Sequence, residues 1–201
     1  MKNAKSKAVQ TIKDEHRSIS AVLHGLRYLA KQIVESPVQP DFAVFRAMIR
    51  YIDEFPERLH HPKEEKYLFA RLVERFPGAV PLAGDLHEEH LTGARLIRDL
   101  EKALAYVEEH SPAGAPTFRT AVEAYSDFHW QHMRKEEEQL LPLAERYLTA
   151  EDWEAIAAAF EDNVDPIAGV PEKEFEDLFS RIALISPAPI GFGDRWERAP
   201  G

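Results

Sequence analysis

The chain has 201 residues, of which 44% are hydrophobic and 30% are charged, as in ordinary globular proteins. It contains no cysteine, which excludes disulfides, thiolate metal sites and a catalytic thiol, and its net charge of -10 argues against nucleic acid as a partner. We expect neither a signal peptide nor a membrane span, because no apolar run is long enough, and the missing cysteine fits a cytoplasmic protein.

Three breaks rich in proline and glycine, at 36–40, 77–78 and 111–116, separate four stretches that are each too long for a strand. In the first stretch, apolar residues recur at helical spacing, which predicts an amphipathic helix with one apolar stripe. This stripe consists of Ile12, Ile19, Leu23, Leu26, Ala30 and Ile33, and His16 occupies the position that completes it.

The third stretch repeats this stripe 74 residues later, at Leu86, His90, Gly93, Ile97, Leu100, Leu104 and Val107. The second and fourth stretches also correspond, at an offset of 72 residues, because His60–Glu65 aligns with His132–Glu137. The chain is therefore interpreted as a duplicated helical hairpin. Two hairpins with short connections predict an all-α, up-down-up-down four-helix bundle without strands.

The acidic excess of the chain gathers after residue 150. Thr149–Asp152 has the pattern of a capping box, and Trp153, Ile156 and Phe160 follow at helical spacing, which predicts a short fifth helix. A further helix is expected from about Pro171 to Ile185. We therefore predict a four-helix bundle at 1–148 and an acidic helical extension at 149–201, which packs on the bundle or forms a homodimer contact.

Four histidines occupy matched positions in the duplicated hairpins. His16 and His90 each replace an apolar residue in a stripe, while His60 and His132 are each followed four residues later by a glutamate, Glu64 or Glu136. Burying those carboxylates near the bundle axis costs several kcal/mol each unless a cation neutralises them, and neither Lys nor Arg lies in the stripes. The pattern predicts a dinuclear site for iron, manganese or zinc.

These residues resemble the hemerythrin-like proteins, specifically the bacterial HHE cation-binding branch, over roughly residues 8 to 147. The resemblance implies two irons joined by an oxygen or hydroxide, with one position open for dioxygen, nitric oxide or another small ligand. It also implies the ligands: His16, His60 and Glu64 for one iron, His90, His132 and Glu136 for the other, with both glutamates bridging.

The sequence departs from oxygen-carrying hemerythrins at two places. Leu86 stands where those proteins have a second histidine on the third helix, and Glu136 ends an HxxxE motif where they have HxxxxD. We expect the seventh ligand to be His61, with His129, His87 or water as alternatives. Pro62 should kink the second helix and bring both His60 and His61 to the metals.

Two further choices concern acidic residues and function. His61 and Glu65 form an HxxxE pair of their own, but the repeat favours Glu64 as the ligand. Glu15, Glu89 and the run 134–138 other than Glu136 are expected to be solvated; the alternative for Glu15 and Glu89 is that each orients a ligand histidine through its other ring nitrogen. The function predicted is binding or sensing of a small ligand, or iron handling under oxidative or nitrosative stress; a di-iron oxidase or peroxidase and a metal-stapled interaction module are the alternatives.

Overall fold

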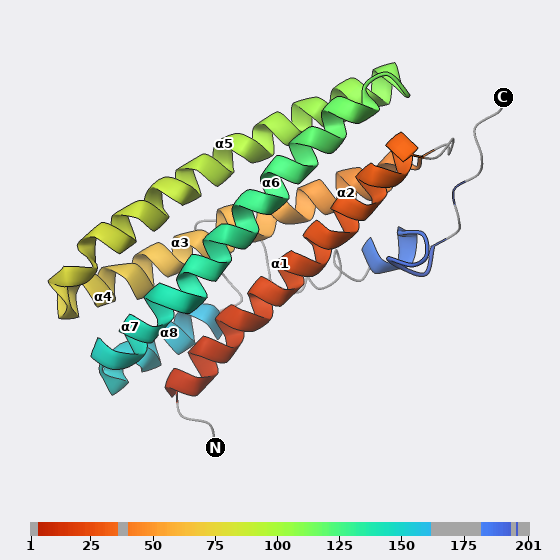
Figure 1. Cartoon of the computed structure of the whole chain (residues 1–201). Coiled ribbons are helices and arrows are strands. Elements are labelled where there is room, and N and C mark those ends of the chain that lie inside the picture. The colour runs from red at the N-terminus through yellow and green to blue at the C-terminus, as the bar shows by residue number, and fades with distance from the viewer. Residues whose placement is uncertain (1–3, 36–39, 162–181, 194–195, 197–201) are drawn as a thin grey trace.

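The structure is a computed structural model that describes residues 4–35, 40–161, 182–193 and 196. Four long helical segments lie side by side along a common direction (Figure 1). They are α1 (Ala4–Glu35); the α2–α4 segment, from α2 (Phe42–Ile52) to α4 (Ala70–Arg75); α5 (Val80–His110); and the α6–α7 segment, from α6 (Ala115–Lys135) to α7 (Leu141–Tyr147). No named strand occurs among these described residues, and the predicted all-α bundle is confirmed.

Three widened π-helical turns interrupt the two segments that carry the HxxxE motifs. They are η1 (Asp53–His60) and η2 (Glu64–Phe69), on either side of α3 (His61–Lys63), and η4 (Glu136–Leu140). Pro62 and Pro142 follow η1 and η4 by two residues, and neither can donate a backbone hydrogen bond. Such π-turns are frequent at functional sites. In η1 the backbone N–H of His61 donates to the carbonyl of Pro56, five residues earlier, which is the hydrogen bond that defines a π-helical turn.

Both predicted apolar stripes are buried, and they divide into two apolar clusters with a polar layer between them. On α1, Ile12 belongs to one cluster and Ile19 to the other, and His16 lies between them. On α5, His90 separates Leu86 from Ile97 in the same way. The interruption that the sequence places in each stripe is therefore a buried polar layer that crosses the bundle.

Helix α8 (Ala150–Glu161) packs against α1 and closes the apolar cluster near the start of that helix (Figure 1). Its capping box forms as predicted: Asp152 N–H donates to Thr149 Oγ1 at 3.3 Å, and Thr149 N–H donates to Asp152 Oδ2 at 3.0 Å. The Arg75 guanidinium donates to the same carboxylate at 2.8 Å and so ties α8 to α4.

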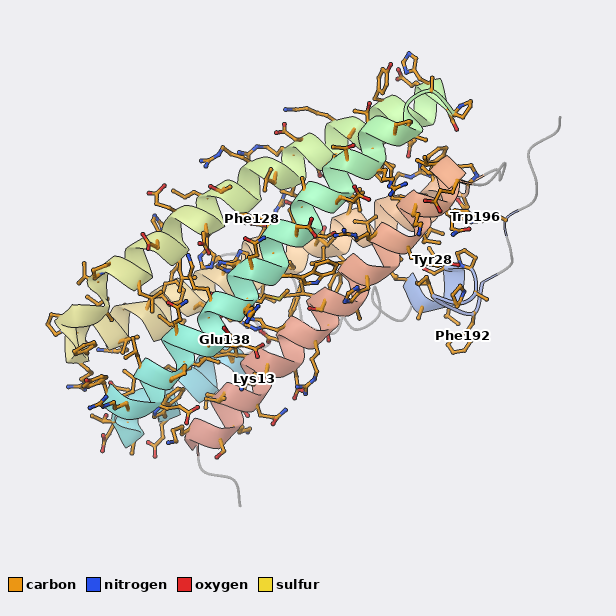
Figure 2. The ribbon with its side chains drawn as sticks, in the orientation of Figure 1. Lys13, Tyr28, Phe128, Glu138, Phe192 and Trp196 are labelled. Atoms are coloured by element: carbon orange, nitrogen blue, oxygen red, sulfur yellow. The ribbon has the colours of Figure 1, made fainter. Side chains whose placement is uncertain are left out.

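Of the remaining tail, residues 182–193 and 196 are described, and Ile182, Ile185, Ile190 and Trp196 pack in or against the other apolar cluster. The helix expected at about 171–185 falls mostly outside the described residues, of which 182–185 are helical. Ile182 is buried in that cluster, and the Trp196 ring lies 5.7 Å from the Phe45 ring, whereas Phe192 points into solvent (Figure 2). None of the described helices is long and apolar enough to cross a membrane.

Truncation of Ile156 to alanine tests whether α8 belongs to the folded core. The side chain is fully buried, so Ile156→Ala should lower the free energy of unfolding by about 2–5 kcal/mol. Glu154→Ala, on the exposed face of the same helix, should change it by no more than about 0.5 kcal/mol. Equal effects of the two variants in a denaturant titration would contradict the packing of α8 on α1.

Candidate metal centre

Two clusters of ligand atoms share the polar layer of the bundle. One comprises His16, His60, Glu64 and Glu136; the other comprises Glu64, His90, His132 and Glu136. Within each cluster the candidate ligand atoms lie within 4.8 Å of one another, and all of these side chains are buried. Because the two clusters have both glutamates in common, the four helical segments contribute to one composite site.

Each glutamate turns one carboxylate oxygen toward each pair of histidines. Glu136 Oε2 lies 3.3 Å from His16 Nε2, and its Oε1 lies 3.3 Å from His132 Nε2. Glu64 Oε1 lies 3.4 Å from His60 Nε2, and its Oε2 lies 3.8 Å from His90 Nε2. This is the arrangement that carboxylates need if they bridge two positions.

The donor set fits a metal on two independent observations. All four oxygens of Glu64 and Glu136 are buried and accept no hydrogen bond from the part of the chain that the structure describes. The Nε2 atoms of His16 and His60 approach to 3.1 Å, as do those of His90 and His132. Two nitrogens about 2.1 Å from a shared ion, at right angles, lie about 3 Å apart. A bound cation therefore explains both the unpaired oxygens and the close nitrogens.

A glutamate holds the outer nitrogen of each of these four histidines. The distances to Nδ1 are 2.9 Å for His16 and Glu137, 2.6 Å for His60 and Glu15, 2.7 Å for His90 and Glu65, and 2.9 Å for His132 and Glu89. An ionised carboxylate only accepts, so Nδ1 donates its proton outward to the glutamate, and Nε2 faces the inner site. Glu15, Glu89 and Glu137 do not form only the expected solvated face: each is partly buried and holds a histidine.

The structure also separates the candidates for the seventh ligand. His61 forms a cluster with His90 and His132, and its ring stacks on that of His90 with a centroid distance of 4.1 Å. His129 instead directs Nε2 to Glu57 Oε1 at 3.2 Å, and the exposed His87 bonds to Glu65 at 2.9 Å. Neither His129 nor His87 belongs to a cluster of candidate ligand atoms among the described residues.

Glu57 is a buried carboxylate that the sequence reasoning missed. It accepts a hydrogen bond from the Tyr125 hydroxyl at 2.8 Å, and its Oε2 lies 3.5 Å from His61 Nδ1. Burial raises the pKa of Glu57, but the contacts with His129 and His61 outweigh burial and keep it well below its usual range. A Cβ at Gly93 would lie 3.0 Å from Glu57 Oε1, so this glycine, in the apolar stripe of α5, makes room for the carboxylate.

The metal-free site attracts protons strongly. Burial lowers the pKa of His60, yet the charge on Glu64 and the contact with Glu15 outweigh burial and raise that pKa to about 9. Burial likewise opposes, and Glu136 chiefly causes, the rise of the His132 pKa to about 10. Burial raises the pKa of Glu64, but the surrounding imidazoles lower it to about 2. When no metal is bound, protons on these imidazoles therefore supply positive charge beside the buried carboxylates.

A depression of about 530 Å³ between α1 and the α6–α7 segment reaches this site from outside. His16 forms part of its wall, together with Ala21 and Trp130. Figure 2 labels Glu138, which also lines the depression. On the other flank, the Phe160 ring of α8 packs 6.1 Å from the His60 ring. The surroundings of His16 and His60 thus differ: His16 lines the depression, whereas Phe160 packs against His60.

The fold and the site together define a class of protein: a four-helix bundle that builds a histidine and carboxylate metal site between its helices. A sequence model of the hemerythrin HHE cation binding domain matches residues 7–144. Because this match covers more than half of the chain, the chain belongs to that family, as the resemblance predicted. The family implies a metal site, typically for iron. A search of curated proteins found no significant match.

The stability of the metal-free protein should depend on pH with a defined sign. The pKa values of His60 and His132 are raised from about 6.5 to about 9 and 10, so the stability that their protons contribute is complete below pH 6.5. It should disappear as the pH rises through 9 and 10. Thermal unfolding of chelator-treated protein should therefore show a falling midpoint between pH 7 and 10; a constant or rising midpoint would contradict these shifts.

Proposed function

We propose that this protein holds two irons in its polar layer and binds or senses a small ligand such as dioxygen or nitric oxide. The observation that carries the proposal is the pair of glutamates, Glu64 and Glu136, each shared between two histidine pairs with unpaired oxygens. His16 and His60 would hold one ion, and His90 and His132 the other. Nitrogen and oxygen donors without sulfur suit iron, with manganese or zinc as the competing ions.

His61 makes the two positions unequal. It lies in a cluster with His90 and His132, so it would give that ion a third imidazole. The position at His16 and His60 then has fewer protein ligands and would keep room for an exogenous one, alongside a bridging oxygen or hydroxide. When bound, an iron pair of this kind supplies redox-active ions with an open coordination position, which is what reversible binding of a diatomic ligand requires.

The surroundings of the site suit a small guest. The depression at His16 offers an approach from solvent, while the packing of Phe160 against His60 closes the opposite flank. We therefore propose that ligands approach along the groove between α1 and the α6–α7 segment. We also propose that residues 149–201 are an extension of a bundle at 1–148, which the contacts of α8 with α1 support; a homodimer contact stays a prediction.

Removal of either bridging carboxylate tests the ligand assignment. Glu64→Ala or Glu136→Ala should reduce metal content from two irons per chain to one or none, because each glutamate reaches both histidine pairs. Metal content by mass spectrometry, with circular dichroism to verify folding, measures this. The matched control is Glu88→Ala, an exposed residue on α5 close to His90. Retention of two irons in both glutamate variants would contradict the bridging roles.

Partial filling of the depression tests the approach route. Ala21→Trp places a large side chain in its wall and replaces none of the proposed ligands, so association of nitric oxide should slow several-fold while metal content stays unchanged. Stopped-flow mixing of the reduced, loaded protein with nitric oxide measures the rate. Gln131→Trp, exposed on α6 and outside the depression, should leave the rate as it was. Equal rates in the two variants would place the route elsewhere.

A further inference from the structure

The four glutamates that contact the Nδ1 atoms of the histidines follow a regular pattern along the chain. Each is adjacent in the chain to a residue of the inner site: Glu15 to His16, Glu89 to His90, Glu65 to Glu64 and Glu137 to Glu136. Yet the histidine that each one holds lies on a different helical segment. Consecutive residues of a helix point about 100° apart, so when one faces the axis, its neighbour faces an adjoining helix.

Followed from segment to segment, these contacts close into a ring. Glu15 on α1 holds His60 on the second segment, and Glu65 on that segment holds His90 on α5. In turn, Glu89 on α5 holds His132 on the fourth segment, whose Glu137 holds His16 on α1. Two of the contacts stay within a hairpin, and two join the hairpins. Every segment thus gives one carboxylate and receives one imidazole.

We propose that Glu15, Glu65, Glu89 and Glu137 form a carboxylate ring of positioning residues that aims all four imidazoles inward and assembles the site across both hairpins before metal binds. This inference rests on the proposed metal-binding function and extends it to residues outside the ligand set. Each ring contact fixes the proton on Nδ1, which leaves Nε2 as the atom that binds a cation.

The exposed fractions of the side chains distinguish the carboxylate ring from ordinary surface ion pairs. The four glutamate side chains are between 12% and 36% exposed, whereas the histidines they hold are at most 5% exposed. The carboxylates therefore keep contact with water while they hold buried partners. Two of them are held in turn: Lys135 contacts Glu89, and His87 lies 2.9 Å from the Glu65 oxygen that also faces His90.

Zinc is the probe for the test, because it is redox-inert and accepts the same nitrogen and oxygen ligands. Glu137→Ala and Glu15→Ala should weaken zinc binding by about 10–100-fold in a chelator competition, the usual effect of losing a partner that orients a ligand. Glu137→Gln should recover part of this loss, because its amide oxygen still accepts the Nδ1 proton. The controls are Asp14→Ala and Glu88→Ala, exposed neighbours of ring members, which should stay within twofold of the parent protein.

A second readout separates positioning from general loosening of the fold. In the zinc-loaded parent protein, nitrogen-15 NMR should show the Nδ1-protonated form for all four histidines that the carboxylate ring holds. In Glu137→Ala the Nδ1 proton of His16 should exchange rapidly with water, while that of His132, held by Glu89, should stay protected.

Unchanged zinc affinity in the ring variants, or a parent protein that binds no zinc, would overturn the ring. So would a loss of zinc affinity in the controls equal to that in the ring variants. Failure of the parent protein to take up iron while it binds zinc would instead contradict the proposed function and leave the ring to be judged by the zinc results. The two failures are therefore distinguishable.

Discussion

The burial of two carboxylates at the centre of the bundle is the constraint on which the rest of the structure depends. Glu64 and Glu136 are at most 1% exposed and have no hydrogen-bond donor among the described residues, a situation that costs several kcal/mol per uncompensated charge. Imidazoles on all four helical segments surround them, and in the metal-free chain protons on those imidazoles supply the positive charge. A bound metal would supply the same positive charge.

The architecture around these carboxylates keeps them dry and fixed. One apolar cluster lies on each side of the polar layer, and α8 completes the cluster beside the start of α1. The π-turns sit where the ligands are: η1 ends at His60, while η2 and η4 begin at Glu64 and Glu136. A widened turn changes the directions in which neighbouring side chains point. At the end of η1, His60 and His61 are both buried. Local backbone geometry and the ligand set are therefore coupled.

The sequence was sufficient to predict the helices and which residues meet in the polar layer, because both follow from periodicity along one helix; that these residues bind metal stays a prediction. His16 and His90 interrupt apolar stripes, and the duplication aligns Glu64 with Glu136, so their common face could be predicted. The sequence raised the orienting of a ligand histidine as an alternative for Glu15 and Glu89, but it could not name their partners or the role of Glu137, because spacing along one helix does not say which side chain of the next helix it meets. Glu57 was not predicted for a related reason: it lies in a π-turn, where the spacing of an α-helix does not apply.

The most direct test of the central claim is the metal content of protein purified aerobically from iron-replete cells, measured by mass spectrometry, with optical spectra of the same sample before and after reduction and re-exposure to air. We predict two irons per chain and an absorption band that bleaches on reduction and returns in air. Zinc alone, or a folded protein without metal, would contradict the claim that this histidine and carboxylate site is a di-iron centre.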